Sequence, residues 1–369
     1  MVRSLGFLCG LIALTTPVAA EIGALRTFND WLVACDNVRF CRAMGVSPTG
    51  SVEGPALIVA REGQGAALPK LLLLWPDSPP GQTMILTADG ETLGSLDPAR
   101  DVEQTEDHGG GQMIKSEAVA QKIFAALRKA KTITIAVEGS KEEPHAVSLA
   151  GASAALLFID DRQKRVGTRT ALVRAGDRDP STVPAPPALP KPPSAPKVPK
   201  KAFAEEAPPA VVKLYLSEAE KACDRDAKEA KEASAYLAGR LSPTQVLYAM
   251  QCWRAAYNFG AAFYVFKEGP GGGTATRAAF PAAFERATQG DVWPTHVLSN
   301  AEFDTDALEV TTFHKGRGIG DCGTAYSWRW TGTKFVPTAA KSMPICRGFI
   351  EENWLQLYRV AGQNKPLAE

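Results

Sequence analysis

The sequence predicts an α+β protein with two disulfide-containing domains, built on antiparallel sheets and joined by a proline-rich linker. The chain has 369 residues, which is long for one typical domain, and 45% of them are hydrophobic, so each half can build a core. Residues 180–209 are rich in Pro, Ala and Lys, a composition that favours neither helices nor sheet ladders. On both sides of this stretch, short β-type runs occur together with helical patterns.

In the N-terminal half we expect strands first and helices afterwards. The expected strands are 28–34, 56–61, 70–75, 82–87 and 132–137, which are separated by Gly and Pro turns. Ser116 is suited to cap a helix over 117–129, in which Ile123 and Leu127 share one face. A second helix is expected to begin near Ser148.

The C-terminal half is expected to open with helices. Ser217 and Glu220 form an S-x-x-E capping box before the charged run 221–233. Ser242-Pro243 predicts the start of another helix. Strands are expected at 261–266, 295–300, 307–313, 325–330 and 334–337, with Thr331-Gly332 as a hairpin turn.

The first twenty residues have the pattern of a signal peptide. Arg3 supplies positive charge, residues 5–14 are apolar, and Val18-Ala19-Ala20 places small residues at a cleavage site. The apolar run is too short to cross a bilayer. We therefore expect cleavage after Ala20 and a periplasmic or secreted protein without stable membrane insertion. Its domains should be 21–179 and 210–369, with the linker at 180–209.

Six cysteines follow the leader, and an even number in an exported chain favours disulfides. Many pairings are possible. Because loop closure favours neighbours, we predict the pairs Cys35–Cys41, Cys223–Cys252 and Cys322–Cys346. The spacings contain no C-x-x-C and place no histidine at ligand spacing, so no metal site is predicted.

Four sequence blocks resemble an exported proteobacterial family of unknown function that carries six cysteines. They are Phe28-x-x-Trp31 with Cys35 and Cys41, then 148–168, then 252–258, then 315–323 continued by 346–348. The N-terminal half is also similar to invasion-associated locus B proteins, through the Phe-x-x-Trp strand and the first cysteine. The family resemblance implies export and no catalytic residue.

The segment 314–323 is the candidate binding site. His314, Lys315 and Arg317 stand among four glycines, whose backbone amides can form an anion-binding nest. In that case Arg317 would hold a carboxylate or phosphate. The alternative, which we favour, is a tight connection in which Arg317 pairs with Asp321 and Cys322 anchors the loop.

Little in this sequence supports an enzymatic function. The chain has four histidines, none of them in H-E-x-x-H, and it lacks a G-x-S-x-G elbow. All six thiols are expected to be bonded, so we assign no catalytic residue. Nucleic acid is excluded as a partner because the 41 basic residues are balanced by 40 acidic ones, which leaves almost no net positive charge.

We therefore predict a non-catalytic periplasmic binding or interaction protein, without cofactor, whose partner is an envelope protein or glycan. The oligomeric state is left open. One alternative is an inhibitor or adaptor of an envelope enzyme, or a host-interaction factor. Another is a hydrolase with a convergent site. Trp328 and Trp330 share one face of a predicted strand and could form a carbohydrate platform, but we favour core packing.

Overall fold

The computed structural model describes residues 23–48, 54–75, 81–105, 111–223, 234–282 and 295–362. The expected leader and its cleavage site lie outside these residues. Within them, four antiparallel sheets carry most of the regular structure, and the helices are short. The fold is therefore all-β, and the predicted α+β class is wrong. None of the described helices is long and apolar enough to cross a membrane.

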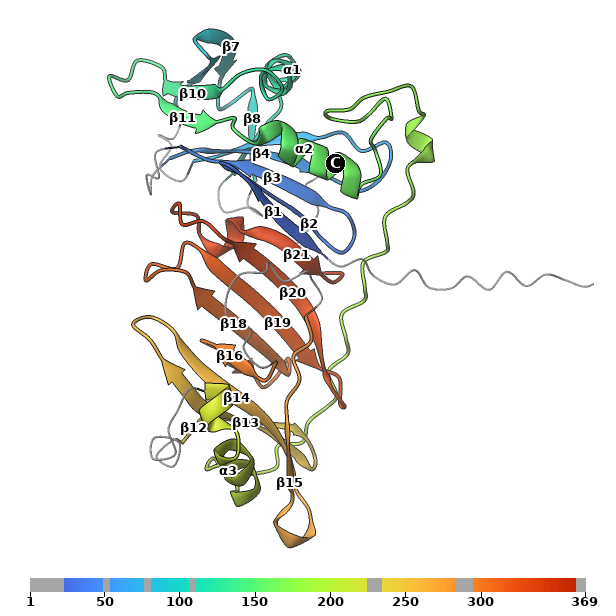
Figure 1. Ribbon diagram of the computed structural model, residues 1–369, viewed down its shortest axis with the longest axis vertical. Coiled ribbons are helices and arrows are strands. Elements are labelled where there is room, and N and C mark those ends of the chain that lie inside the picture. Colours follow the sequence, from blue (N-terminus) through green and yellow to red (C-terminus); the bar gives the residue numbers. More distant parts are fainter. Residues whose placement is uncertain are drawn as a thin grey trace, which may run out of the picture.

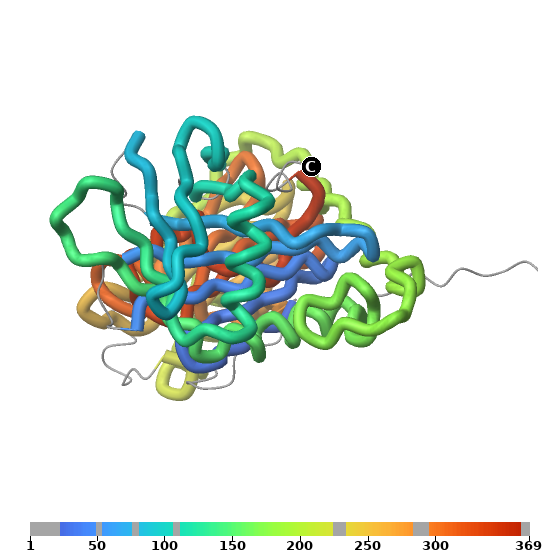
Figure 2. Tube along the Cα trace, turned by 90° about the horizontal axis from the view of Figure 1, so that it is seen from above, coloured from blue at the N-terminus to red at the C-terminus, as the bar shows by residue number. Residues whose placement is uncertain are grey.

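The sheets are stacked along the long axis of the molecule (Figure 1), and they overlie one another when seen from above (Figure 2). The cap sheet contains β11 (His145–Ser148), β10 (Thr132–Val137), β6 (Met84–Ala88) and β7 (Glu91–Leu96). Below it lies the N-terminal sheet, with β1 (Ala24–Phe28), β2 (Trp31–Cys35), β3 (Cys41–Gly45), β4 (Ala56–Arg61), β5 (Lys70–Leu74), β9 (Gly111–Ile114) and β8 (Val102–Thr105).

Two further sheets come from the C-terminal half. The middle sheet contains β17 (Glu302–Asp304), β18 (Glu309–Lys315), β19 (Gly323–Trp330), β20 (Phe335–Met343) and β21 (Leu355–Arg359). The base sheet contains β12 (Ala235–Ser242), β13 (Gln245–Arg254), β14 (Phe259–Lys267) and β15 (Thr274–Arg277), with β16 (Val297–Ser299) also paired to β14.

In the part of the chain that the structure describes, four short α-helices cover the two ends of the stack. They are α1 (Glu117–Ala126), α2 (Ala152–Arg162), α3 (Pro209–Leu216) and α4 (Ala219–Cys223). The first two pack with the cap sheet on the N-terminal sheet, and the last two pack on the base sheet. Single 3₁₀ turns lie at Pro180–Thr182, Pro270–Gly272 and Glu351–Asn353.

Hydrophobic clusters fill every gap between the layers, so the N-terminal, middle and base sheets are covered on both faces. This arrangement explains why a helix was wrongly predicted after Ser242. Ser242 is the last residue of β12, and Pro243 lies in the turn between β12 and β13. Val246 of β13 faces α3 and α4, and Leu247 faces the middle sheet. A strand covered on both faces is apolar at nearly every position, so it also satisfies a helical spacing.

Several other predicted strands and helices differ from the observed ones in where they begin or end. The strand expected at 28–34 is two strands, with a turn at Asn29, whose φ is +49°. The helix expected near Ser148 begins at Ala152, because β11 occupies the preceding residues. Ser217 does not cap a following helix: its hydroxyl donates to the carbonyl of Leu214 at 2.6 Å and ends α3. Residues 224–233 of that expected helix lie outside the described residues.

The proline-rich segment forms a strap, residues 183–208, that runs along the side of the stack (Figure 1). It has no regular structure, as its composition predicts. Proline lacks an N–H group, but its carbonyl can accept hydrogen bonds. Successive layers supply the donors: Arg39 Nη1 to Pro184 O at 3.2 Å, Ala361 N to Pro190 O at 2.8 Å, Arg240 Nε to Lys201 O at 2.9 Å, and Tyr248 Oη to Ala204 O at 2.6 Å.

The three disulfides have the expected pairing, Cys35–Cys41, Cys223–Cys252 and Cys322–Cys346. In each pair, both cysteines lie on the same side of the strap along the sequence. The hydrophobic core includes residues from both before and after the strap, because one cluster contains side chains of both the N-terminal and the middle sheets. Arg359 Nε of β21 donates to Asp36 Oδ2 at 2.5 Å, and the backbone of Arg359 exchanges two hydrogen bonds with the side chain of Asn37. Segments 21–179 and 210–369 thus share a core.

Arg42 is an exception within this shared core. It lies on β3 with only 4% of its surface exposed, opposite Ala34 and Ala60. Among the described residues, its Nε and Nη2 atoms have no hydrogen-bond partner. Burial lowers the pKa of its guanidinium to about 10. A buried charge without a partner destabilises a folded protein.

Replacing Arg42 with methionine should therefore raise stability. The thioether side chain can follow the same apolar path without the buried charge, and we expect a gain of about 1–3 kcal/mol in the free energy of unfolding. Denaturant unfolding measures this. The same replacement at the exposed Arg174 is the control and should change little. A marked loss of stability in Arg42→Met would show that the guanidinium has a stabilising role.

Candidate functional site

The loop 316–322 connects β18 to β19 and closes tightly on itself. Gly316 N donates to Cys322 O at 2.7 Å, and Gly320 N donates to Arg317 O at 3.0 Å. A Cβ atom at position 316 would lie 2.7 Å from the Sγ of Cys322. Gly323 has φ +137°, and a Cβ there would lie 1.8 Å from the carbonyl oxygen of His314. Close packing therefore accounts for these two glycines without an anion.

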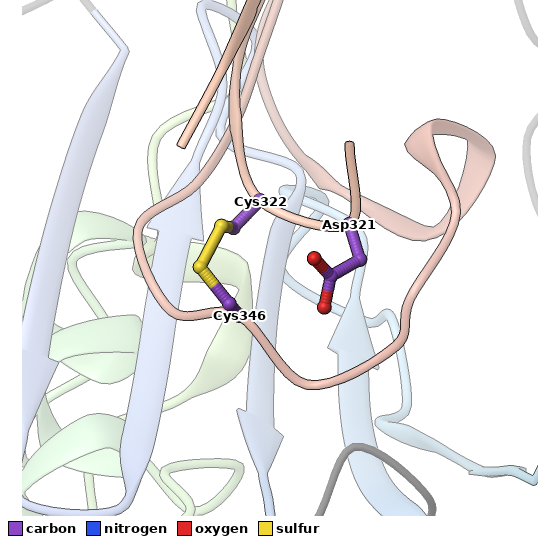
Figure 3. Close-up of side chains that lie close together, drawn as sticks. All are labelled: Asp321, Cys322 and Cys346. Atoms are coloured by element: carbon purple, nitrogen blue, oxygen red, sulfur yellow. A yellow bond between two sulfur atoms is a disulfide. The ribbon is translucent and has the colours of Figure 1, made fainter. Parts of the chain in front are cut away.

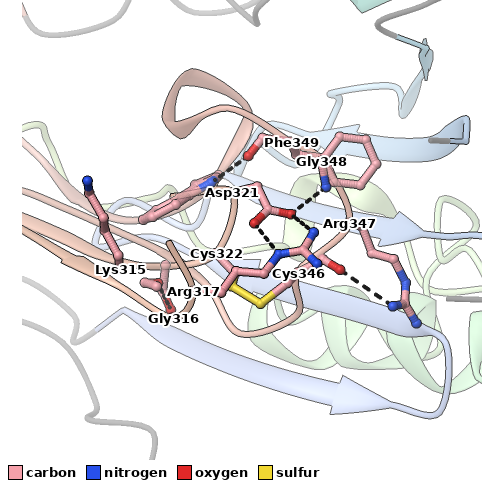
Figure 4. The surroundings of a disulfide bond; sticks show 12 residues. Lys315, Gly316, Arg317, Asp321, Cys322, Cys346, Arg347, Gly348 and Phe349 are labelled. Atoms are coloured by element: carbon pink, nitrogen blue, oxygen red, sulfur yellow. Dashed lines mark hydrogen bonds and ion pairs between the residues drawn. A yellow bond between two sulfur atoms is a disulfide. The ribbon is translucent and has the colours of Figure 1, made fainter. Parts of the chain in front are cut away.

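Arg317 and Asp321 form a two-pronged ion pair beside the Cys322–Cys346 disulfide (Figure 4). Arg317 Nε donates to Asp321 Oδ1 at 2.7 Å, and Nη2 donates to Oδ2 at 2.5 Å. The amide of Gly348 donates to the same Oδ2 at 2.6 Å. Hydrogen bonding from Arg317 and from this amide lowers the pKa of the Asp321 carboxyl, although burial acts in the opposite direction. We call this arrangement the Arg317–Asp321 clamp.

The clamp includes a cluster of atoms that resembles a metal site. The carboxylate of Asp321 and the Sγ atoms of Cys322 and Cys346 lie within 4.8 Å of one another (Figure 3). Both sulfur atoms are bonded in the disulfide, so neither can act as a thiolate ligand. The remaining carboxylate is engaged by Arg317. The cluster therefore ties the loop to the segment around Gly348.

Two asparagines that sequence reasoning did not single out hold the candidate loop against the β13–β14 hairpin. Asn258 Nδ2 donates to Lys315 O at 2.8 Å, and Lys315 N donates to Asn258 Oδ1 at 3.0 Å. Asn300 Nδ2 donates to Asn258 Oδ1 at 2.7 Å and to Phe313 O at 2.8 Å. The third and fourth sequence blocks therefore meet at Asn258, although no feature of either block predicts this contact.

Exposed side chains, together with the half-buried Lys315, gather where the hairpin and the loop meet. We call this the hairpin–loop surface: Arg254, Tyr257, Phe259, His314, Lys315 and Ile319. Tyr257 is 44% exposed, Phe259 39% and Ile319 70%. The hydroxyl of Tyr257 donates to Gly316 O at 3.2 Å, and its ring lies against Gly318. Large apolar side chains that are exposed close together are typical of an interaction surface.

The structure divides the four predicted site residues into two groups. His314 and Lys315 belong to the hairpin–loop surface, and His314 Nδ1 lies 3.2 Å from Ser299 Oγ. Arg317 and Asp321 face each other in the clamp, which is the structural alternative favoured from the sequence. Trp328 and Trp330 are buried between the middle and base sheets, so they pack in the core.

A cleft of about 480 Å³ lies on the middle sheet next to the hairpin–loop surface. Asn300 and Phe313 line it and also belong to the asparagine network. Its remaining lining residues are Glu302, Thr311, Thr312, Ala325, Tyr326, Ser327, Ala339, Lys341 and Glu351. Asn300 and Phe313, which help to hold the hairpin–loop surface in place, therefore also form one wall of the cleft.

A buried polar cluster joins the base sheet to the end of α3. Glu218 Oε1 accepts hydrogen bonds from Tyr264 Oη at 2.6 Å and from His296 Nε2 at 2.9 Å. Its other carboxylate oxygen accepts from Arg277. Burial lowers the pKa of the His296 ring, so the neutral ring is the form that the fold retains. Because these partners satisfy the Glu218 carboxylate, the cluster serves to fix α4 on the base sheet.

Arg317→Ala should lower the melting temperature by several degrees, because it leaves the buried Asp321 carboxylate without its charged partner. Arg317→Lys should recover part of the loss, since lysine keeps the charge and loses the planar fork. Lys315→Ala is the control and should melt like the parent. A parent-like Arg317→Ala protein would contradict a structural role for the clamp.

The effect of Arg317→Ala should also depend on pH. The pKa of Asp321 is lowered by folding. Its stabilising contribution is therefore present above the unfolded-state value of about 3.9 and is lost as the pH falls through the folded value. The difference in melting temperature between Arg317→Ala and the parent should be large at pH 7 and should shrink below about pH 4.

Comparisons with known proteins agree with the extent of this single stacked fold. Residues 25–361, from β1 to just past β21, match the family model described as "Protein of unknown function (DUF1176)". The chain is 28% identical over 349 residues to "Uncharacterized protein YpfG" of Escherichia coli (strain K12), a match that covers 92% of each chain. No solved structure matches the chain. The protein therefore belongs to the DUF1176 family of proteins of unknown function.

Proposed function

We propose that this protein is an exported, non-catalytic binding protein of the cell envelope that contacts a partner protein through the hairpin–loop surface. The observation that carries the proposal is the exposure of Tyr257, Phe259 and Ile319 beside basic side chains. Aromatic residues and arginine are enriched at the centres of interfaces. A surface with this composition is suited to partner binding.

The rigidity of the platform supports the same function. Asn258 ties the hairpin to the end of β18, and the clamp with its disulfide holds the other side of the loop. A surface that is ordered before binding loses less conformational entropy when the partner docks. The affinity can then come from a few exposed anchors such as Tyr257 and Ile319.

Charge indicates the chemistry of the partner. Arg254 and Lys315 contribute positive charge to the hairpin–loop surface, whereas burial lowers the pKa of the His314 ring and so favours its neutral form. The nearby Asp321 carboxylate is neutralised by Arg317. We therefore propose a partner with an apolar anchor surrounded by acidic groups, because complementary charge favours encounter and register. Export is proposed on the leader pattern together with three disulfides, which persist in oxidising compartments.

A capture experiment with matched variants tests the proposal. The mature protein, residues 21–369, is immobilised, exposed to envelope extract, and its bound proteins are identified by mass spectrometry. The double variant Tyr257→Ser/Ile319→Ser should keep the parent melting temperature and lose the captured partner.

The matched control is Leu68→Ser/Ile350→Ser, which removes two other exposed apolar side chains, 74% and 53% accessible. It should retain the partner. If both double variants capture the same proteins as the parent, the hairpin–loop surface is not the binding site and the proposal is wrong.

A further inference from the structure

We infer that the cleft on the middle sheet binds an amino sugar, a hydroxyl-rich ring that carries an ammonium group. This inference goes beyond the proposed function, and it does not depend on a partner at the hairpin–loop surface. It rests on the shape of the cleft floor, on the rigidity of its walls, and on the Glu302 carboxylate, which no group within the described residues engages.

The floor of the cleft is formed by small side chains that lie side by side across neighbouring strands. Thr311 of β18 is directly opposite Ser327 of β19, which is opposite Ala339 of β20. Ala325 lies on the same face, two residues before Ser327. Short side chains leave open space above the sheet. The resulting volume of about 480 Å³ falls within the range of pockets that hold small ligands.

The walls of the cleft are held in place without a ligand. The ring of Phe313 stacks on Trp354, with 5.2 Å between the ring centroids and 20° between the planes. Both ends of the Asn300 amide are engaged: Nδ2 donates to Asn258 and Phe313, and Oδ1 accepts from Phe259 N. The cleft is therefore preformed, and Asn300 shapes it.

The charged groups of the cleft leave an excess of acceptors. Lys341 Nζ pairs with Glu351 Oε1 at 2.9 Å. Within the part of the chain that the structure describes, no hydrogen bond or ion pair engages the Glu302 carboxylate on β17. The hydroxyl of Ser327 is already bonded to Thr338 at 2.6 Å. A ligand that brings donors and a positive charge therefore complements the Glu302 carboxylate.

An amino sugar meets these requirements. One face of a pyranose ring is apolar and fits against Ala325 and Ala339, while its hydroxyl groups donate from the ring edge. Its ammonium group fits the Glu302 carboxylate, since a charge-assisted hydrogen bond is stronger than a neutral one. Anionic ligands such as nucleotides are disfavoured, because two carboxylates face one ammonium in the cleft.

Titration calorimetry on the mature protein, residues 21–369, tests the inference with two probes of equal length. These are a glucosamine oligosaccharide and its N-acetylated counterpart, which is neutral. We expect the glucosamine oligosaccharide to bind at least tenfold more tightly, equivalent to about 1.4 kcal/mol. Glu302→Gln should remove this preference without changing the melting temperature, because Glu302 is exposed on an edge strand.

Two further variants sharpen the test. Ala339→Phe fills the floor and should abolish binding of both oligosaccharides. Glu352→Gln removes an exposed carboxylate next to the cleft but outside its lining, and it should bind like the parent. The inference is overturned if neither oligosaccharide binds, if both bind equally, if Glu352→Gln weakens binding as much as Glu302→Gln, or if a lysine-containing peptide binds more tightly than the glucosamine oligosaccharide.

Discussion

The packing of the N-terminal sheet on the middle sheet is the contact on which the rest of the structure depends. It buries one face of each sheet in a cluster that also contains Cys322 and Trp354. The buried Asp36–Arg359 pair and the Asn37 hydrogen bonds cross the same interface. Removing one member of such a pair would leave an uncompensated charge, so these contacts fix how the two sheets are aligned.

This contact also positions the candidate site. The Cys322–Cys346 disulfide lies at the edge of the shared core, and the Arg317–Asp321 clamp is built directly on it. The loop between β18 and β19 is thereby fixed from one side by the core and from the other by Asn258. The packed layers beneath the exposed side chains and the cleft therefore hold both in place.

Several features could be predicted because they are local. The strands β4 and β10 have the expected bounds, since each is a short β-branched or aliphatic run between turns. The disulfides follow from loop closure between neighbours. The Arg317–Asp321 pair lies within one loop, so its residues were visible together in the sequence.

The failures arise from contacts between distant segments. Because β13 is covered on both faces, its apolar run lacks the alternation that distinguishes a strand from a helix. Asn300 acts through Asn258 and Phe313, and no spacing in the sequence connects these three residues. The shared core was missed for the same reason: a proline-rich segment indicates a linker, but it does not show whether the chains on either side pack together.

Cleavage of the strap tests the shared core most directly. A protease site in place of the exposed residues 194–195 allows the folded protein to be cut between its two halves. If the N-terminal and middle sheets share one core, the two fragments will elute together under native conditions and unfold in a single calorimetric transition. Two folded fragments that separate without denaturant, each with its own transition, would contradict the account.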